Sequence, residues 1–273
     1  MRFTNSFKKI ISSLSTDAGK SVKEKEVINY TWEGVYLNAD ELPKDIKGFD
    51  SKKFVRDTYS MTKALVEQSL INQNTIQLEV KDEVSLLPFL ISSVFGRQKN
   101  KLRILDFGGG MGVTYLHLKS SINSTINLDY HVVEQKEMCE EGKNIFISDS
   151  SIHFHSELPA DLKDINIIYI NSALQYLMDY HSLLKKLASY KPEYILLVRL
   201  SAGDVPTFIS IQKNVSDTRI PYYFFNLKEL QAILLENGYD LIFKGAIGRK
   251  YNMDNLPPAN RLEYQSNLLF IRK

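Results

Sequence analysis

The chain has 273 residues, of which 44% are hydrophobic, and its 34 basic and 32 acidic side chains give a formal net charge of +2. This is the composition of a globular protein with enough chain for a large core, and the balanced charge gives no indication of nucleic-acid binding. The single cysteine excludes an intrachain disulfide and a multi-cysteine zinc site.

The N-terminal segment, residues 1–25, is basic and carries an apolar stripe at helical spacing. The stripe consists of Phe3, Phe7, Ile10, Ile11 and Leu14. It favours a helix packed on the protein or on a second subunit, and weak peripheral binding of residues 1–20 to a membrane surface is the alternative. No apolar run reaches the ~18 residues of a membrane-spanning helix, and no secretory signal pattern is present. We therefore expect a cytoplasmic protein, of an oligomeric state that the sequence does not indicate.

The next segment predicts an irregular cap followed by helices. Residues 30–50 are aromatic, charged and turn-rich. One helix is expected from Ser51 to Leu70, and a second, buried helix from Glu83 to Phe95. Pro88 is tolerated in this second helix if it lies in the first turn.

A glycine-rich turn follows the first apolar strand of the next region. The strand ends in Asp106-Phe107, and the turn contains Gly108, Gly109, Gly110 and Gly112 before a helical pattern begins near Val113. Glycines allow the backbone to adopt positive φ and to approach a ligand closely. The helix that follows offers unpaired N–H groups and the positive end of its dipole. This pattern indicates a site for a nucleotide-like ligand.

The acidic residue in front of the turn separates two ligand classes. A dinucleotide places its pyrophosphate at such a turn, where the anion Asp106 is unfavourable. The ammonium group of an amino-acid moiety is compatible with an anion there. The Asp-x-Gly-x-Gly-x-Gly form resembles the first motif of the class I S-adenosylmethionine (SAM) methyltransferases, which implies S-adenosyl-L-methionine as the cofactor.

From Lys101 onward, strands and helices alternate, which predicts a parallel sheet covered on both faces. Two terminal strands without an intervening helix suggest an antiparallel pair, as in the class I methyltransferase sheet. We therefore expect an α/β fold with a Rossmann-like class I methyltransferase sheet of seven strands, the last antiparallel, in residues 99–273, and a helical N-terminal cap in residues 1–98. The expected strands are 102–107, 128–133, 152–155, 165–170, 194–199, 239–246 and 266–271.

A second acidic residue, Glu134, follows the second strand, 22 residues after Gly112 (134 − 112). A carboxylate there accepts hydrogen bonds from the two ribose hydroxyls of an adenosine. The same spacing suits NAD.

The chain also resembles a family of methyltransferases encoded with bacterial surface-polysaccharide (O-antigen or capsule) biosynthesis genes. The resemblance covers residues 30 to 273 and implies O-methylation of a sugar or glycan precursor. The matching features are Trp32, Gly34 and Tyr36, the Leu-Asp-Phe-Gly-Gly-Gly loop, Val133-Glu134, Asn171 to Tyr176, Arg199, Thr207-Phe208 and Gln212.

Ligands of such sheets bind beyond the carboxyl ends of the strands. By that rule, we expect Ser156 and Asn171 to bind the cofactor together with the glycine-rich turn and Glu134. The catalytic candidates are His155, Tyr176, His181 and Arg199. Either histidine is a candidate base, with a structural histidine or a helix cap as the alternatives, and Tyr176 is alternatively a packing residue. Arg199 is suited to a carboxylate or phosphate, or alternatively to an ion pair. No metal site is expected, since no ligand spacing is readable.

Two other functions stay open at this stage. The absence of an obvious base is compatible with a catalytically silent methyltransferase-like protein that serves binding or assembly. A nicotinamide-dependent oxidoreductase is disfavoured by Asp106 and by the terminal strand pair.

Overall fold

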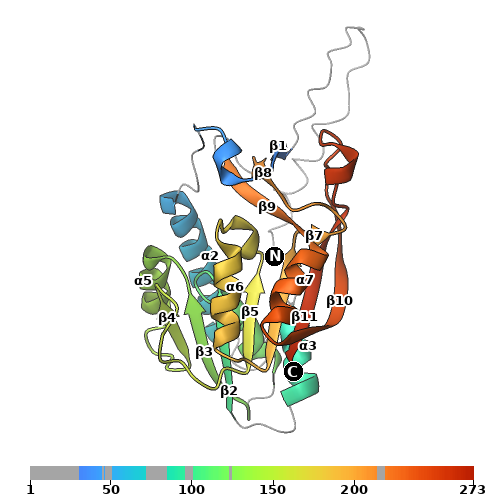
Figure 1. Ribbon diagram of the computed structural model, residues 1–273. Helices are drawn as coiled ribbons and strands as arrows, with labels where there is room; N and C mark the ends of the chain where they lie inside the picture. Colours follow the sequence, from blue (N-terminus) through green and yellow to red (C-terminus); the bar gives the residue numbers. More distant parts are fainter. Residues whose placement is uncertain are drawn as a thin grey trace, which may run out of the picture.

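The computed structural model describes residues 31–44, 46, 51–71, 85–95, 101–122, 125–213 and 219–273. The predicted helix in residues 1–25 lies outside this part of the chain and stays a prediction. A large sheet carries helices on both faces, and a smaller sheet lies beyond one end of its strands (Figure 1). Among the described residues, no helix combines the length and the hydropathy needed to cross a bilayer.

The large sheet has the strand order β10-β11-β6-β5-β2-β3-β4. Neighbours from β4 to β6 pair in parallel, whereas β11 is antiparallel to both β6 and β10. The expected fold class, a Rossmann-like sheet of seven strands with an antiparallel last strand, is therefore confirmed. Its strands are β2 (Lys101–Phe107), β3 (Asn127–Val133), β4 (Ile152–His155), β5 (Ile167–Asn171), β6 (Tyr194–Leu200), β10 (Tyr239–Lys250) and β11 (Tyr264–Arg272).

The central strands are apolar on both faces because both faces are covered. Ile104 and Leu105 are adjacent in β2 and both are fully buried, one in each of two core clusters. Helices α2, α3, α4 and α5 cover the face of Ile104, and α6 and α7 cover the face of Leu105. The helices are α2 (Ser51–Ile71), α3 (Leu86–Leu90, continued by a π-helical turn at Ile91–Phe95), α4 (Val113–Ser121), α5 (Lys136–Ile145), α6 (Tyr180–Ser189) and α7 (Leu227–Glu236).

Side-chain caps fix the N-terminal ends of α6 and α7. Asn226 Oδ1 accepts hydrogen bonds from the backbone N–H groups of Lys228 (2.9 Å) and Glu229 (3.2 Å) at the start of α7. At the start of α6 the cap is Asp179, whose carboxylate accepts from the N–H of Ser182 at 3.3 Å. The alternative interpretation of His181 as the cap is therefore wrong.

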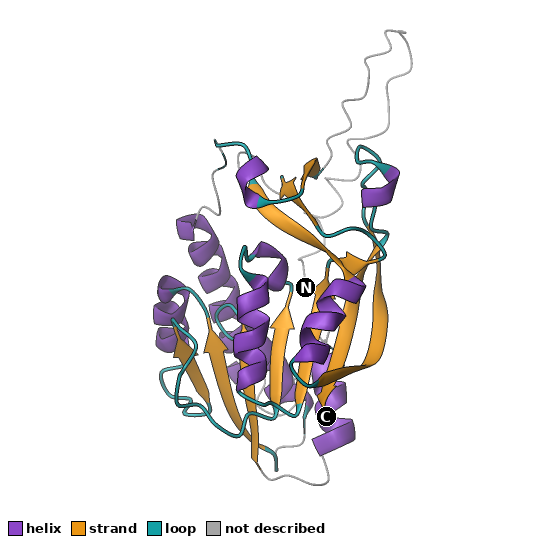
Figure 2. Cartoon of the chain, viewed as in Figure 1, coloured by secondary structure: helices purple, strands orange, loops and turns teal. Residues whose placement is uncertain are grey.

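The smaller sheet has the order β1-β8-β9-β7, with β8 antiparallel to β1 and β9. Figure 2 shows it beyond the ends of the main strands. One expectation is corrected here. Residues 32–36 form a strand within the segment expected to be irregular. The strands are β1 (Trp32–Tyr36), β7 (Ala202–Gly203), β8 (Phe208–Gln212) and β9 (Ile220–Asn226).

The Trp32 side chain explains why β1 adds to a hairpin almost two hundred residues away. Its ring centroid lies 4.8 Å from those of Tyr222 and Phe224 on β9 and 5.6 Å from that of Tyr251. Burial of a large aromatic side chain in such a cluster is strongly favourable. The smaller sheet therefore has an aromatic core of its own.

Candidate functional site

The glycine loop, residues 108–112, lies between β2 and α4 at the carboxyl edge of the large sheet. Gly108 has φ +73°, and a Cβ there would lie 2.4 Å from Cβ of Ala173 in the loop after β5. Gly110 has φ +58°, but the nearest atom to its Cβ position is Cε of Met138, at 3.8 Å. The loop therefore packs on the protein at Gly108 and is open at Gly110.

Asp106 lies beneath this loop. Its side chain is 1% exposed, and its Oδ2 atom accepts a hydrogen bond from the Tyr130 hydroxyl at 2.7 Å. Its Oδ1 atom has no hydrogen-bond partner among the described residues. Burial raises the pKa of Asp106 to about 7, against the lowering effect of the Tyr130 hydrogen bond. Contact between this carboxyl group and a ligand's ammonium group stays a prediction.

Glu134 meets the glycine loop from the end of β3. Its carboxylate accepts hydrogen bonds from the backbone N–H groups of Gln135 (2.7 Å) and Gly110. Burial raises its pKa, and these two backbone hydrogen bonds oppose the rise. The loop is joined to β3 a second time, because the N–H of Gly108 donates to the carbonyl oxygen of Val133 at 2.9 Å. The two signals identified in the sequence, the glycines and the acid, thus form one site.

The ends of β5 and β6 lie beside this site and carry Asn171 and Arg199, two of the residues expected at the site. Nε of Arg199 donates a hydrogen bond to Oδ1 of Asn171 at 2.8 Å, and the backbone N–H of Arg199 donates to Oδ1 of Asn267 at 2.9 Å. Arg199 has φ +52° and Ser172 has φ +56°. Such left-handed conformations cost roughly 1–3 kcal/mol for side chains like these and are found preferentially at functional sites.

A buried polar network connects these strand ends to the smaller sheet. Nε2 of Gln175, which is fully buried, donates to the Ser172 hydroxyl (3.2 Å), the Arg199 carbonyl (3.1 Å) and the Tyr222 hydroxyl (3.2 Å). The hydroxyl of Ser201 lies 2.5 Å from that of Tyr222 and 2.7 Å from that of Tyr251. Ser201, Tyr222 and Tyr251 were not identified from the sequence, because the smaller sheet that aligns them was not predicted.

Tyr176 belongs to the same region, in a turn of 3₁₀-helix after β5. Its hydroxyl donates to Oε1 of Gln212 at 2.9 Å, and its ring meets that of Tyr222 edge to face. Burial raises the pKa of Tyr176 well above its ordinary value. The phenol is therefore neutral at physiological pH and acts as a hydrogen-bond donor.

The remaining predicted residues are dispersed. His181 is exposed in the first turn of α6, with its ring centroid 4.4 Å from that of Tyr180. Ser156 is exposed directly after β4. Nε2 of His155 lies 2.9 Å from Nδ1 of His131, which gives His155 a partner on the face of the sheet. The site is therefore formed by the glycine loop, Glu134, and the ends of β5 and β6.

A scan against protein-family models and a search of curated proteins find no match to the chain. A search of solved structures does find matches. Magnesium protoporphyrin IX methyltransferase from Synechocystis PCC 6803, solved with bound SAH, is 15% identical, with a TM-score of 0.48, covering 82% of this chain and 100% of that one.

A second match is the Burkholderia thailandensis 1,6-didemethyltoxoflavin-N1-methyltransferase with bound 1,6-didemethyltoxoflavin and S-adenosylhomocysteine, at 12% identity and a TM-score of 0.49, covering 85% of this chain and 94% of that one. A third is an S-adenosylmethionine-dependent methyltransferase from Clostridium acetobutylicum, at 11% identity and a TM-score of 0.48, covering 78% and 98%. At these identities and scores, such a likeness does not transfer an activity or a ligand to this chain.

Proposed function

We propose that the protein is a methyltransferase that uses S-adenosyl-L-methionine. The observation that carries this proposal is the hydrogen bond from the Gly110 N–H to the Glu134 carboxylate, which joins the open part of the glycine loop to the acid at the end of β3. Asp106 under the loop and β11, which is antiparallel to β6, support it. A pyrophosphate would meet two carboxyl groups here, so a dinucleotide is the poorer ligand.

The residues present fit the cofactor. Glu134 would accept hydrogen bonds from the ribose hydroxyls, and the backbone at Gly110 has free space where any other residue would carry a side chain. The buried Oδ1 atom of Asp106, which lacks a partner in the described chain, is an acceptor for an ammonium group. When bound, the cofactor supplies an electrophilic methyl carbon on a sulfonium.

The ends of β5 and β6 are assigned to the methyl acceptor. Arg199, held by Asn171, orients an acceptor that carries an anionic group, such as a phosphate. Collinear placement of donor and acceptor supplies a large part of the acceleration of such a displacement. Tyr176 is a neutral donor, so an oxygen acceptor needs another base. His181, exposed at the N-terminus of α6, is the residue proposed for that role.

We further propose, at a finer level, that the acceptor is a hydroxyl group of a sugar or glycan precursor of a surface polysaccharide, in the cytoplasm. The sequence resemblance supports this acceptor. The amide, phenol and guanidinium groups at the ends of β5 and β6, which suit a phosphorylated sugar, also support it. The basic segment of residues 1–20 would bring the enzyme to lipid-linked precursors at the membrane surface.

Turnover of radiolabelled S-adenosyl-L-methionine against a panel of nucleotide sugars and lipid-linked sugars tests the proposal. Transfer of label to one member supports the full proposal. Binding of S-adenosylhomocysteine without transfer to any tested acceptor would favour the silent binding protein. Binding of NADH in place of S-adenosylhomocysteine would contradict the proposed cofactor.

A further inference from the structure

A cluster of one carboxylate and three imidazoles lies on the face of the sheet formed by β3 and β4. The two strands pair in register, with His131 opposite His153 and Val133 opposite His155. Residues two apart in a strand share a face, so Asp129, His131, His153 and His155 form one patch, called here the histidine cluster. The segment that follows β4, residues 156–166, contains no helix. His153 is accordingly exposed, with 44% of its side chain accessible.

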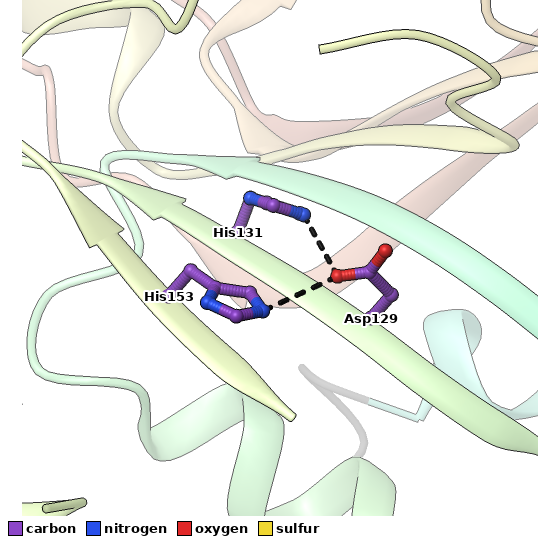
Figure 3. Close-up of side chains that lie close together, drawn as sticks. All are labelled: Asp129, His131 and His153. Atoms are coloured by element: carbon purple, nitrogen blue, oxygen red, sulfur yellow. Dashed lines mark hydrogen bonds and ion pairs between the residues drawn. The ribbon is translucent and has the colours of Figure 1, made fainter. Parts of the chain in front are cut away.

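Three side chains of this cluster, those of Asp129, His131 and His153, point toward one another (Figure 3). Oδ1 of Asp129 lies 2.9 Å from Nε2 of His131 and 3.4 Å from Nε2 of His153. One ligand atom from each of the three residues lies within 4.8 Å of the other two. Ligands bound to zinc at ~2.0–2.1 Å in tetrahedral geometry stand about 3.3 Å apart. The two distances from Oδ1 of Asp129 lie within about 0.4 Å of that spacing. A water molecule would complete the coordination on the exposed side of His153.

The surroundings orient these ligands. The other carboxylate oxygen of Asp129, Oδ2, accepts from Nε of Arg103 at 2.8 Å and lies 3.2 Å from Nζ of Lys101. Oδ1 is thereby left to face the two imidazoles. Nδ1 of His131 lies 2.9 Å from Nε2 of His155. A hydrogen bond on the second ring nitrogen is the usual support of a metal-bound histidine, because it fixes the tautomer that presents the other nitrogen to the ion.

We propose that Asp129, His131 and His153 bind one divalent transition-metal ion, with Zn²⁺ as the first candidate. Imidazole nitrogen is a good ligand for zinc and for its neighbours in the first transition row, whereas Mg²⁺ and Ca²⁺ prefer oxygen ligands. The plain alternative is an ion-free cluster in which His131 donates to Asp129. The two arrangements differ at His153, which the ion-free cluster does not need.

The position of the ion assigns it a structural role. The ion would join β3 to β4 on the sheet face. One of its ligands, His131, lies three residues before Glu134 in the chain. None of its ligands belongs to the ends of β5 and β6. We therefore expect the ion to stabilise the strand that carries Glu134 and to take no part in the chemistry.

The test uses the untagged full chain, freed of metal by a chelator and then dialysed against Zn²⁺. We expect one ion per chain by elemental analysis and a Zn²⁺-dependent rise in the unfolding temperature. Tetrahedral coordination would also give visible absorption bands on titration with Co²⁺. His153→Asn, at an exposed position, should weaken Zn²⁺ binding by at least roughly 10-fold, the smallest cost of changing even a residue that only hydrogen-bonds to a metal ligand.

His181→Asn, which removes an exposed histidine outside the cluster, is the matched control and should bind Zn²⁺ as the wild type does. The variant at His153 is preferred because removal of Asp129 would leave Arg103 without its carboxylate and endanger the fold. Two results would overturn the proposal. One is a wild-type protein that binds no Zn²⁺ above the level of His153→Asn. The other is His153→Asn with unchanged affinity and unchanged Co²⁺ absorption.

Discussion

Nε of Arg199 donates a hydrogen bond to Oδ1 of Asn171 across 2.8 Å, and this contact ties the end of β6 to the end of β5. Both residues lie near the carboxyl ends of their strands, and ligands of such sheets bind beyond these ends. The contact fixes the direction of the Arg199 guanidinium group, and the backbone of Arg199 has φ +52°.

Arg199→Lys should lower the turnover number by about 10-fold or more, because a lysine cannot reproduce the planar fork that meets an anionic group in two places. Affinity for S-adenosylhomocysteine should stay within about twofold, since the proposed cofactor contacts are Glu134 and the glycine loop. The control is Arg261→Lys, whose guanidinium also makes hydrogen bonds but donates to the backbone carbonyl groups of Leu256 and Asp254. Equal turnover of the two variants would remove Arg199 from the acceptor site.

Glu134→Ala should weaken binding of S-adenosylhomocysteine by about 1–3 kcal/mol, the cost of leaving hydrogen-bonding groups unsatisfied. Calorimetric titration measures the change. Glu137→Ala removes a nearby carboxylate from the exposed first turn of α5, and it should leave the affinity unchanged. A loss of similar size in both variants would indicate a general effect of charge and would contradict the assigned contact.

Asp106→Asn should change how stability depends on pH. Because burial raises the pKa of Asp106 from its ordinary 3.8 to about 7, the folded protein binds more protons than the unfolded chain between these values. The stabilisation present below pH 4 is lost as the pH rises to 7. Asparagine does not ionise, so the variant should gain roughly 2–4 kcal/mol relative to the wild type between pH 4 and pH 8. Urea denaturation measures the free energy of unfolding of both proteins at each pH. If the two values changed in parallel with pH, the carboxyl group would not be buried as described.

Tyr222→Phe should reduce the free energy of unfolding by about 1–3 kcal/mol, because Gln175 and Ser201 lose a buried hydrogen-bond partner. Its neighbour Tyr223 points to the other face of β9, where its ring packs on that of Phe225. Tyr223→Phe is therefore the matched control, and a change below about 0.5 kcal/mol is expected for a substitution outside such a network. Denaturant unfolding of both variants decides the point, and equal losses would contradict the network.

Much of the large sheet could be predicted from the sequence, since its signals are local. Apolar runs mark β2 to β6, and Asn226 and Gly238 mark the ends of α7, where Gly238 adopts φ +89°. The glycine loop and Glu134 were identified from their spacing, and the structure joins them. The antiparallel β11 followed from the absence of a helix between the last two strands.

The smaller sheet could not be predicted in the same way, because its strands are brought together by residues far apart in the chain. Trp32 and Tyr222 belong to segments that read as irregular when each is taken alone, yet their rings lie 4.8 Å apart. The histidine cluster was missed for a related reason. Asp129 and His131 alternate on one strand and His153 and His155 on the next, but only the register of β3 with β4 brings the two pairs together.

The most direct test of the proposed cofactor site is calorimetric titration of S-adenosylhomocysteine into Gly110→Ala and Gly238→Ala. Both glycines have positive φ and free space at the Cβ position, with nothing nearer than 3.8 Å, so both substitutions carry similar backbone strain. Only Gly110 lies in the glycine loop. We predict micromolar binding by the wild type and by Gly238→Ala, and a loss of at least about 10-fold in Gly110→Ala, which places a methyl group where the ligand approaches. Equal binding by Gly110→Ala and the wild type, or no binding by either, would contradict the account.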